Sequence, residues 1–338
     1  MIQLIERGWY QQASWLKVLR PLSILFTRLS RRRRAKFQCS DSLYQSPVPI
    51  IVVGNISVGG TGKTPVVLAL IELLRSFGYR PGIVSRGYGA KPPSYPWRIA
   101  ADQPSAETGD EPLLLHSRGQ VPVVIDPDRP AAVRHLLANS DCDLIISDDG
   151  LQHYALKRDI EIAVIDGVRG LGNQCCLPEG PLREPPERLS EVDFILQNGG
   201  TEIQYPGSQM FTLAPIQIMS LQGMQIYIAS EWSESQTIKK VHAVCGIGNP
   251  KRFFNTLREL GLEVIEHSFS DHHQYTQADF DGLNDYPIMM TEKDAVKCKL
   301  LNIPNSWVLQ VAAMLPDTFK DSLLQRLAAI DTKGTENG

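Results

Sequence analysis

The sequence contains no uninterrupted apolar run near the ~18 residues that a helix needs to span a bilayer. This holds even in the N-terminal segment, where large apolar side chains are frequent. The segment also lacks the order of a signal peptide, because its basic cluster follows the apolar part and no small-residue cleavage site appears. We therefore expect a protein that neither crosses a membrane as one helix nor is secreted.

Cysteine is present at six positions, but no two cysteines form a C-x-x-C pair. Their spacing is not that of a small disulfide-stapled domain, and the adjacent Cys175 and Cys176 do not suit an ordinary disulfide. A structural zinc site would need paired ligands that the sequence lacks. The cysteines are therefore predicted to be reduced thiols in the cytosol.

The composition is that of an ordinary globular protein. Of 338 residues, 43% are hydrophobic and 21% are charged, which argues against a disordered, collagen-like or multi-span membrane protein. A chain of this length suits two domains better than one. We expect a basic amphipathic segment over 1–45, a phosphate-loop core over 46–230, a smaller α/β domain over 231–330 and a disordered tail over 331–338.

Positive charge is concentrated at the N-terminus. Residues 1–40 hold nine basic residues and one acidic residue, a net charge of +8, and because the whole chain carries −3 the remainder carries −11. Aromatic and aliphatic side chains alternate with the basic ones, and Pro21 is expected to divide the segment into two helices. This composition is typical of amphipathic helices in the interface of an anionic membrane.

Two other interpretations of this segment stay open. Its helix could pack on the body and leave the arginines in water. Alternatively, it could be a nucleic-acid arm, although the acidic body shows no base-stacking module or groove-binding motif. We predict an anionic membrane surface as the partner and no nucleic acid, while protein partners are not indicated.

From residue 49 the chain alternates short β-branched runs with helical stretches. The predicted strands are 49–55, 80–86, 121–126, 142–149, 160–166 and 192–198. Continuous apolar runs of this length are typical of buried parallel strands, and the intervening helices predict right-handed crossovers in a doubly wound sheet. Since ligands bind outside the carboxyl ends of such strands, one site is expected near Gly54, Asp126, Asp148, Asp149 and Asp166.

A second alternation follows residues 205–230, which are expected to form short irregular strands. Further strands are predicted at 241–248, 262–269, 287–291 and 307–312, with helices at 250–260, near 276–284 and from Glu292. This pattern predicts a second, smaller α/β domain, and the final residues, DTKGTENG, are expected to be disordered.

Residues 52–64, VVGNISVGGTGKT, contain most of a phosphate-binding loop. Gly62, Lys63 and Thr64 complete the pattern G-x-x-x-x-G-K-[ST], but Ser57 stands in place of its first glycine. A predicted strand enters and a helix leaves, as such a loop requires, and Ser57 only begins the turn. Lys63 would neutralise the β- and γ-phosphates and Thr64 would bind Mg²⁺. The predicted nucleotide-binding residues are Ser57, Val58, Gly59, Gly60, Thr61, Gly62, Lys63 and Thr64.

Other loop types fit less well. An ordinary glycine-rich turn would not explain the buried strand that ends in Asp148 and Asp149, where nucleotide hydrolases keep a magnesium-binding acid. Dimeric ATPases with the loop G-K-G-G-x-G-K-T carry a lysine where this chain has Val58. The guanine-reading stretch N-K-x-D is absent, and T-E-K-D at 291–294 is only a partial likeness.

Seven blocks match one family in order between residues 54 and 297: GNISVGGTGKTP, SRGYG, GDEP, DDGLQH, LPEGPLRE, SDHHQY and TEKDAVK. They resemble the tetraacyldisaccharide 4′-kinases, which phosphorylate the lipid A precursor at the inner membrane of Gram-negative bacteria. The resemblance implies transfer of the γ-phosphoryl group of ATP, with Mg²⁺, to the 4′-hydroxyl of a tetraacylated glucosamine disaccharide 1-phosphate. The stretch GNQCC at 172–176 departs from the glycine-richer form expected there.

The resemblance also implies residue roles and a location. The catalytic residues would be Asp110 as base, His272 as its assistant, and Lys63. The metal ligands would be Thr64, Asp148 and Asp149. Seven residues at or near strand ends or in the matched blocks could bind the sugar or its 1-phosphate: Arg86, Tyr88, Glu111, Arg129, Gln152, His153 and Arg183. The enzyme would be peripheral, on the cytoplasmic face of the inner membrane.

From the residues alone, purely structural interpretations of these positions stay open. Asp110 could be a helix N-cap, His272 could lie in a solvated turn, and each arginine could pair with a neighbouring carboxylate. The alternative functions are a P-loop ATPase or GTPase switch and a kinase for a soluble small molecule.

Overall fold

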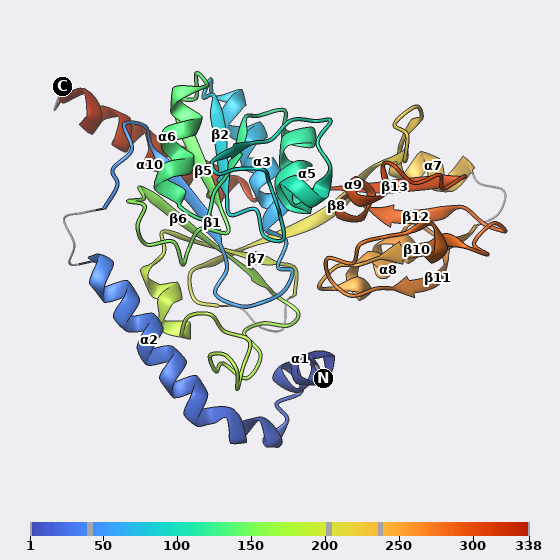
Figure 1. Cartoon of the computed structure of the whole chain (residues 1–338), viewed down its shortest axis with the longest axis horizontal. Coiled ribbons are helices and arrows are strands. Elements are labelled where there is room, and N and C mark those ends of the chain that lie inside the picture. Colours follow the sequence, from blue (N-terminus) through green and yellow to red (C-terminus); the bar gives the residue numbers. More distant parts are fainter. Residues whose placement is uncertain (1, 39–42, 201–204, 236–238, 337–338) are drawn as a thin grey trace.

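The computed structural model describes residues 2–38, 43–200, 205–235 and 239–336. Figure 1 shows three parts: a large body, a smaller unit of strands and helices beside it, and an N-terminal arm that projects from the body. Cys39 lies outside the described residues, and the other five cysteines are free thiols, as predicted.

The body contains the expected doubly wound sheet. Its strands lie in the order β8-β7-β6-β1-β5-β2-β4-β3, and every neighbouring pair except β3–β4 is parallel. All six predicted strands are present: β1 Ile50–Gly54, β2 Pro81–Ser85, β4 Val123–Ile125, β5 Leu144–Asp148, β6 Ile160–Asp166 and β7 Phe194–Asn198. A short edge strand, β3 Trp97–Arg98, completes the sheet.

Helices cover both faces of this sheet because successive strand residues point in opposite directions. Ile51 and Val53 of β1 join one apolar core with α3 Lys63–Ser76 and α5 Asp110–Gly119. Ile50 and Val52 join the opposite core with α6 Arg129–Ala138. The short helix α4 Ser105–Thr108 precedes α5.

The smaller unit is also present as predicted. Its strands β10 Lys240–Cys245, β11 Glu263–Ser268, β12 Ile288–Thr291 and β13 Ser306–Met314 are mutually parallel in the order β11-β10-β12-β13. Its helices are α7 Ala229–Ser235, α8 Pro250–Glu259 and α9 Glu292–Cys298. The helix predicted near 276–284 is only a 3-10 turn, Gln277–Phe280, which precedes Gly282 at φ +82°.

Strand β8, Ser208–Ser220, corrects the expectation for residues 205–230. Instead of short irregular strands, one long strand runs through both parts of the molecule. Its first residues pair with β7, and the rest pairs with β13 and with β9 Ile226–Ile228. Pro215 does not interrupt the strand, because it lies where the β13 ladder shifts register and its missing N–H is tolerated there.

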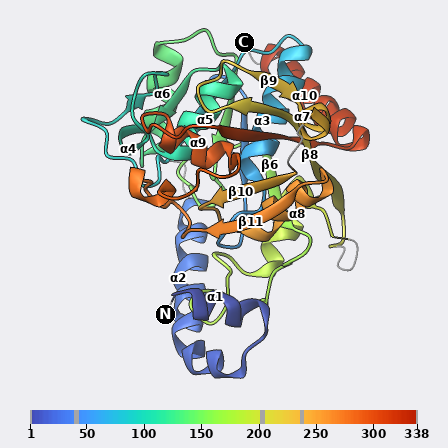
Figure 2. The same cartoon turned by 90° about the vertical axis from the view of Figure 1, so that its right-hand side faces the viewer.

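The N-terminal arm consists of α1 Ile2–Tyr10, the 3-10 turn Ser14–Leu19 and α2 Arg20–Gln38, and it extends below the body in Figure 2. The prediction that Pro21 breaks a helix is wrong. Pro21 lies in the first turn of α2, where the N–H groups have no intrahelical partners. The two α-helices are separated instead near Gln12, which has φ +52°. Among the described helices, none has both the length and the apolar character needed to cross a bilayer.

The final helix, α10 Asp317–Glu336, corrects the prediction of a disordered tail as far as residue 336, and residues 337 and 338 lie outside the described residues. Phe319, Leu323 and Leu327 are fully buried at helical spacing in the core around α3, although β13 immediately before them belongs to the smaller unit. Because these contacts anchor the helix, further turns add at little cost, and it continues to Glu336. The chain therefore returns to the body at its end.

Leu323→Ala should lower the free energy of unfolding of the whole protein by about 2–5 kcal/mol, because it leaves a cavity in the main core. Urea unfolding followed by tryptophan fluorescence measures this loss. Gln325→Ala, at an exposed position on the same helix, is the control and should change stability by less than about 0.5 kcal/mol. An unchanged midpoint in Leu323→Ala would show that α10 is not part of the body core.

Candidate active site

The phosphate loop joins β1 to α3 in the predicted way. Gly59 and Gly62 have φ +101° and +97°, values that favour glycine. A side chain at position 62 would also collide with the Asn198 amide, whose Nδ2 donates to the carbonyl of Thr61 at 3.0 Å. The backbone conformation and this close approach therefore both require glycine at position 62.

The missing first glycine has a local explanation. Ser57 is buried and forms an antiparallel bridge with Leu182, and the N–H of Val58 donates to the carbonyl of Pro181 at 2.8 Å. Ser57 is not among the residues with positive φ. The loop therefore begins as a strand-like segment paired with 181–182, and a side chain is tolerated there.

Asp149 lies between two cations at the end of β5. Its carboxylate oxygens lie 3.3 Å from Lys63 Nζ and 2.9 Å from Arg183 Nη1, which joins the phosphate loop to the LPEGPLRE segment. Burial alone would raise the pKa of Asp149, but Lys63 and Arg183 outweigh it and hold the pKa well below its usual range. Asp149 is therefore a stable anion.

Asp148, the last residue of β5, is in the opposite situation. It is 2% exposed, its Oδ2 accepts from Ser85 at 3.4 Å, and its Oδ1 has no hydrogen-bond partner among the described residues. Burial, with the nearby negative charges of Glu111 and Asp149, raises the pKa of Asp148 well above its usual range. A buried carboxylate with a free oxygen needs a cation beside it.

Mg²⁺ fits these residues. It is commonly held by one or two carboxylates together with substrate phosphates rather than by an all-protein cage. In keeping with this, no cluster of three or more metal-binding side chains occurs within the part of the chain that the structure describes. Asp148 and Asp149, with Thr64 at the start of α3, are the residues that would hold the ion.

Asp110 and His272 meet across the two parts of the molecule, although 162 positions separate them. Asp110 is the first residue of α5 and is 5% exposed, and its Oδ2 lies 3.2 Å from Nδ1 of His272. His272 lies in the loop after β11, at φ +62°. The N-cap of α5 is Gly109, so the alternative that Asp110 serves as an N-cap is wrong.

A cavity of about 660 Å³ opens beside this pair. Its wall includes Asp148, Asp149 and His272, and six of the seven predicted substrate-binding residues: Arg86, Tyr88, Glu111, Gln152, His153 and Arg183. The Tyr88 ring lies 5.3 Å from the His272 ring. Burial, reinforced by Arg129 and Arg86, lowers the pKa of His153 to about 3, so it is neutral in the cavity.

Arg129, the seventh predicted substrate residue, does not line the cavity. It is 1% exposed, and its guanidinium donates to the backbone carbonyls of Asp126 at 2.8 Å and Asp148 at 3.2 Å. Burial lowers its pKa to about 10, despite the neighbouring Asp148 and Asp149. Its position beneath the site suits it to support the ends of β4 and β5.

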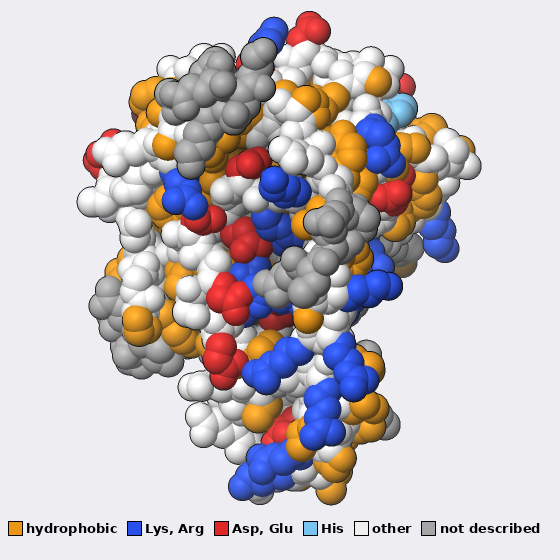
Figure 3. Space-filling model, turned by 90° about the vertical axis from the view of Figure 1, so that its left-hand side faces the viewer, with side chains coloured by type: hydrophobic (Ala, Val, Ile, Leu, Met, Phe, Trp, Pro, Cys, Tyr) orange, Lys and Arg blue, Asp and Glu red, His pale blue; other side chains and the backbone are white. Residues whose placement is uncertain are grey.

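The arm supplies part of the cavity wall, which the sequence analysis did not predict. Phe26, Leu29, Ser30 and Arg33 of α2 line it together with the residues of the body. Figure 3 shows basic side chains along the arm, apolar side chains at its outer edge, and acidic and basic side chains together in the hollow above it.

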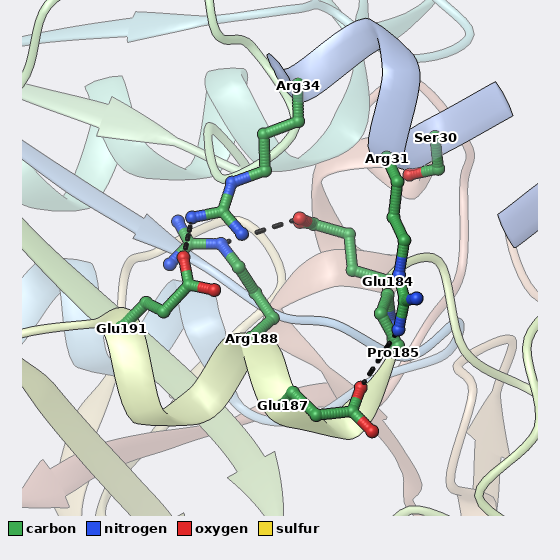
Figure 4. A pocket seen from close by; sticks show the side chains of 8 residues that line it. All are labelled: Ser30, Arg31, Arg34, Glu184, Pro185, Glu187, Arg188 and Glu191. Carbon is green, nitrogen blue, oxygen red and sulfur yellow. Dashed lines mark hydrogen bonds and ion pairs between the residues drawn. The ribbon is translucent and has the colours of Figure 1, made fainter. Parts of the chain in front are cut away.

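Ion pairs fix α2 to the turn Pro186–Glu191 (Figure 4). Arg31 lies 3.6 Å from Glu187, and Arg34 pairs with Glu191. Further along the helix, Arg20 lies 2.8 Å from Glu179. The body-facing side of α2 therefore contacts the body, as the packed-helix interpretation expected, but its arginines pair with carboxylates instead of extending freely into water.

Two further residues beside the site were not predicted from the sequence. Glu184, almost fully buried, accepts from Gln152 Nε2 at 2.7 Å and from the Tyr154 hydroxyl at 2.6 Å, which orients Gln152. Lys293 contacts His272, Asp271 and Glu111. Both lie in blocks already quoted, LPEGPLRE and TEKDAVK, but only the folded chain brings them to the site.

These features define a P-loop phosphotransferase. They are the phosphate loop at the end of β1, the carboxylate pair at the end of the neighbouring β5, and the cavity beside them. Residues 15–328 match the family described as tetraacyldisaccharide-1-P 4′-kinase, and this chain belongs to that family. It is 50% identical over 329 residues to the tetraacyldisaccharide 4′-kinase of Ectopseudomonas mendocina, covering 97% of each chain.

Two further proteins are similar. The tetraacyldisaccharide 4′-kinase of Pseudomonas aeruginosa is 48% identical over 326 residues, which cover 95% of this chain and 97% of that protein. The crystal structure of LpxK from Aquifex aeolicus in complex with ATP matches with a TM-score of 0.74 and 26% identity, over 93% of this chain and 99% of that one.

The two aspartates should respond to amide substitution with opposite signs. In EDTA at pH 8, Asp148→Asn should raise the free energy of unfolding, because it removes a charge that the folded state disfavours, whereas Asp149→Asn should lower it by removing an anion that Lys63 and Arg183 stabilise. Urea unfolding measures both.

The pH dependence supplies the control. When folding raises the pKa of a carboxyl, the protein loses stability as the pH rises from the unfolded-state pKa toward the folded-state pKa. The stability that Asp148→Asn gains should therefore shrink toward pH 5. A gain of the same size at pH 5 and pH 8 would contradict the charge explanation.

Proposed function

We propose that this kinase transfers the γ-phosphoryl group of ATP to the 4′-hydroxyl of a tetraacylated glucosamine disaccharide 1-phosphate, the lipid A precursor, at the cytoplasmic face of the bacterial inner membrane. The single observation that carries the proposal is the contact between Asp110 and His272 beside a cavity that also holds Asp148 and Asp149. A base, a phosphate loop and room for an acceptor occur together. A nucleotide switch would need no such base.

The proposed reaction is a direct transfer from ATP to the acceptor hydroxyl. The 4′-oxygen attacks the γ-phosphorus, the bond from that phosphorus to the β,γ-bridging oxygen breaks, and ADP leaves. The hydroxyl proton passes to Asp110, whose orientation the His272 ring fixes. Because the transition state of phosphoryl transfer is loose, a carboxylate that accepts the proton late is a sufficient base.

Charge neutralisation falls to the phosphate loop and its neighbours. Lys63, now paired with Asp149 at 3.3 Å, is close enough to exchange that partner for the β- and γ-phosphates. The N–H groups from Gly59 to Thr64 would surround the phosphate oxygens at the N-terminus of α3. Mg²⁺ would supply further neutralisation when bound, held by Thr64, Asp148 and Asp149.

The cavity suits a phosphorylated sugar. Arg86 and Arg183 offer bidentate donors to a phosphate, and Gln152, held by Glu184, can bind hydroxyl groups. The part of the cavity wall that α2 forms differs from the rest, because its Phe26 and Leu29 are apolar. We place the acyl chains on this side, so that α2 separates the sugar from the hydrocarbon of the membrane.

The arm can reach a membrane with its free face. Trp15, Val18, Leu22, Ile24, Leu25 and Leu29 are 46–79% exposed, and the exposed Arg28, Arg32 and Lys36 lie on the same arm. On α2, Leu22, Leu25 and Leu29 share one face, and the residues of the ion pairs to the body, Arg20, Arg31 and Arg34, lie on the opposite face. Apolar burial together with attraction to anionic lipid would hold the enzyme at the interface where its acceptor lies.

Activity is tested by transfer of labelled γ-phosphate from ATP to tetraacyl disaccharide 1-phosphate in detergent. Asp110→Asn keeps the shape of the side chain but removes the base, and should lower kcat by about 10²–10⁴-fold. Lys63→Ala should abolish transfer, and Asp102→Ala, at an exposed position before α4, is the control. If wild type consumed ATP without labelling the lipid, the switch would replace the kinase.

Membrane binding is tested by co-sedimentation with vesicles that contain anionic lipid. Replacing Val18, Leu22 and Leu25 by serine should weaken binding roughly 100-fold, at about 1 kcal/mol for each side chain. The matched control replaces Met224, Ile226 and Ile228, which are 54–81% exposed on the smaller unit, and should bind like wild type. Equal binding of both triple variants would contradict docking through the arm.

A further inference from the structure

Lys293 is held in a fixed place at the boundary between the two parts of the molecule. It is the second residue of α9, whose N-cap Thr291 accepts from the N–H of Asp294. The preceding residue, Glu292, pairs with Arg118 of α5, and Arg118 also donates to the carbonyl of Val311 at 3.2 Å. The base of the Lys293 side chain is therefore rigidly anchored against the body.

The ammonium group of Lys293 has three partners around the proposed base. Its Nζ lies 3.1 Å from Glu111 Oε1, 3.0 Å from Asp271 Oδ1 and 3.4 Å from His272 Nε2. Glu111 adjoins Asp110 on α5, whereas Asp271 adjoins His272 on the smaller unit. One cation thus separates two carboxylates that would otherwise repel each other, and it contacts the imidazole on its far side.

The contact with His272 has a chemical consequence. An ammonium group has donors only, so a hydrogen bond from Lys293 to Nε2 of His272 requires Nε2 to accept, and Nε2 then carries no proton. The ring proton then lies on Nδ1, which faces Asp110 Oδ2 at 3.2 Å. A neutral imidazole in this tautomer donates to Asp110 and leaves the other carboxylate oxygen, Oδ1, free to accept a proton.

We propose that Lys293 is a positioning residue for phosphoryl transfer, which holds His272 in its Nδ1–H tautomer and so orients the base Asp110. The proposal rests on the proposed function, because it assigns the ammonium group a role in that reaction. Glu111, predicted as a substrate ligand, takes part in this arrangement by holding Lys293 from the body side.

The charge of Lys293 is secure. Burial would lower the pKa of its ammonium group, but the carboxylates of Glu111 and Asp271 outweigh this effect and raise the pKa. Its side chain is 16% exposed, so water competes little for these contacts. The raised pKa keeps this group a charged donor at neutral pH.

The kinetic experiment is a double-mutant cycle of Lys293→Met, His272→Ala and the double variant. Lys293→Met should lower kcat by about 10- to 100-fold, while KM for ATP and for the lipid changes less than about threefold. In the His272→Ala background the same change should cost less than about twofold, because the residue acts through His272. Lys293→Arg, which keeps a donor without an acceptor, should recover part of the loss.

Lys299→Met is the matched control, at an exposed position just after the same helix, and should behave as wild type. If the effects of Lys293→Met and His272→Ala multiplied fully, or if KM rose with kcat unchanged, Lys293 would be a link between the two parts and the proposal would be overturned. Thermal unfolding of each variant shows whether lost activity reflects lost structure.

A spectroscopic measurement decides the tautomer without reference to activity. Histidine side-chain ¹⁵N–¹H spectra, with His272 assigned by its disappearance in His272→Ala, should show Nδ1–H in wild type and a mixture of tautomers in Lys293→Met. An Nε2–H signal for His272 in wild type would overturn the inference. If wild type showed the expected tautomer but phosphorylated no lipid, the proposed function would fail while the arrangement around Lys293 stood.

Discussion

The backbone hydrogen bonds of β8 hold the two parts of this molecule in one orientation. At its start the strand pairs with β7 of the body, and beyond Phe211 it pairs with β13 of the smaller unit. Because these hydrogen bonds fix the register between the strands, the smaller unit has a set position relative to the body, and the loop that carries His272 lies opposite α5. The return of α10 into the body core adds a second, apolar attachment. The contact between Asp110 and His272 across the two parts depends on both.

In the body, the two carboxylates at the end of β5 differ in how well neighbouring groups stabilise their charge. Asp149 has two cationic partners, whereas Asp148 has one long hydrogen bond and a buried free oxygen. When ionised, Asp148 therefore disfavours the folded state unless a cation lies beside it. The same strand end thus provides an anion paired with Lys63 and Arg183, and a second carboxylate that would be available to a metal bound with ATP.

In the proposed function, the two sides of α2 would connect the membrane to the cavity. The charged side of this helix is tied to the turn after LPEGPLRE, the same segment that pairs with Ser57 at the start of the phosphate loop. Its apolar side is free, and residues between the two sides form part of the cavity wall. An acceptor whose tails stay in the bilayer would therefore find the site at a fixed depth below the surface.

Most of the fold and several residues of the candidate site were predictable from the sequence. Apolar runs, glycines and helix spacing depend on neighbours in the chain, so they indicated the strands of both sheets and the phosphate loop, and strand ends pointed to Asp148 and Asp149. The single strand β8, the burial of Arg129, the α2 wall and the contacts of Lys293 depended on tertiary structure. Their partners lie far away in sequence, and only the packing of the whole chain decides which distant segments meet.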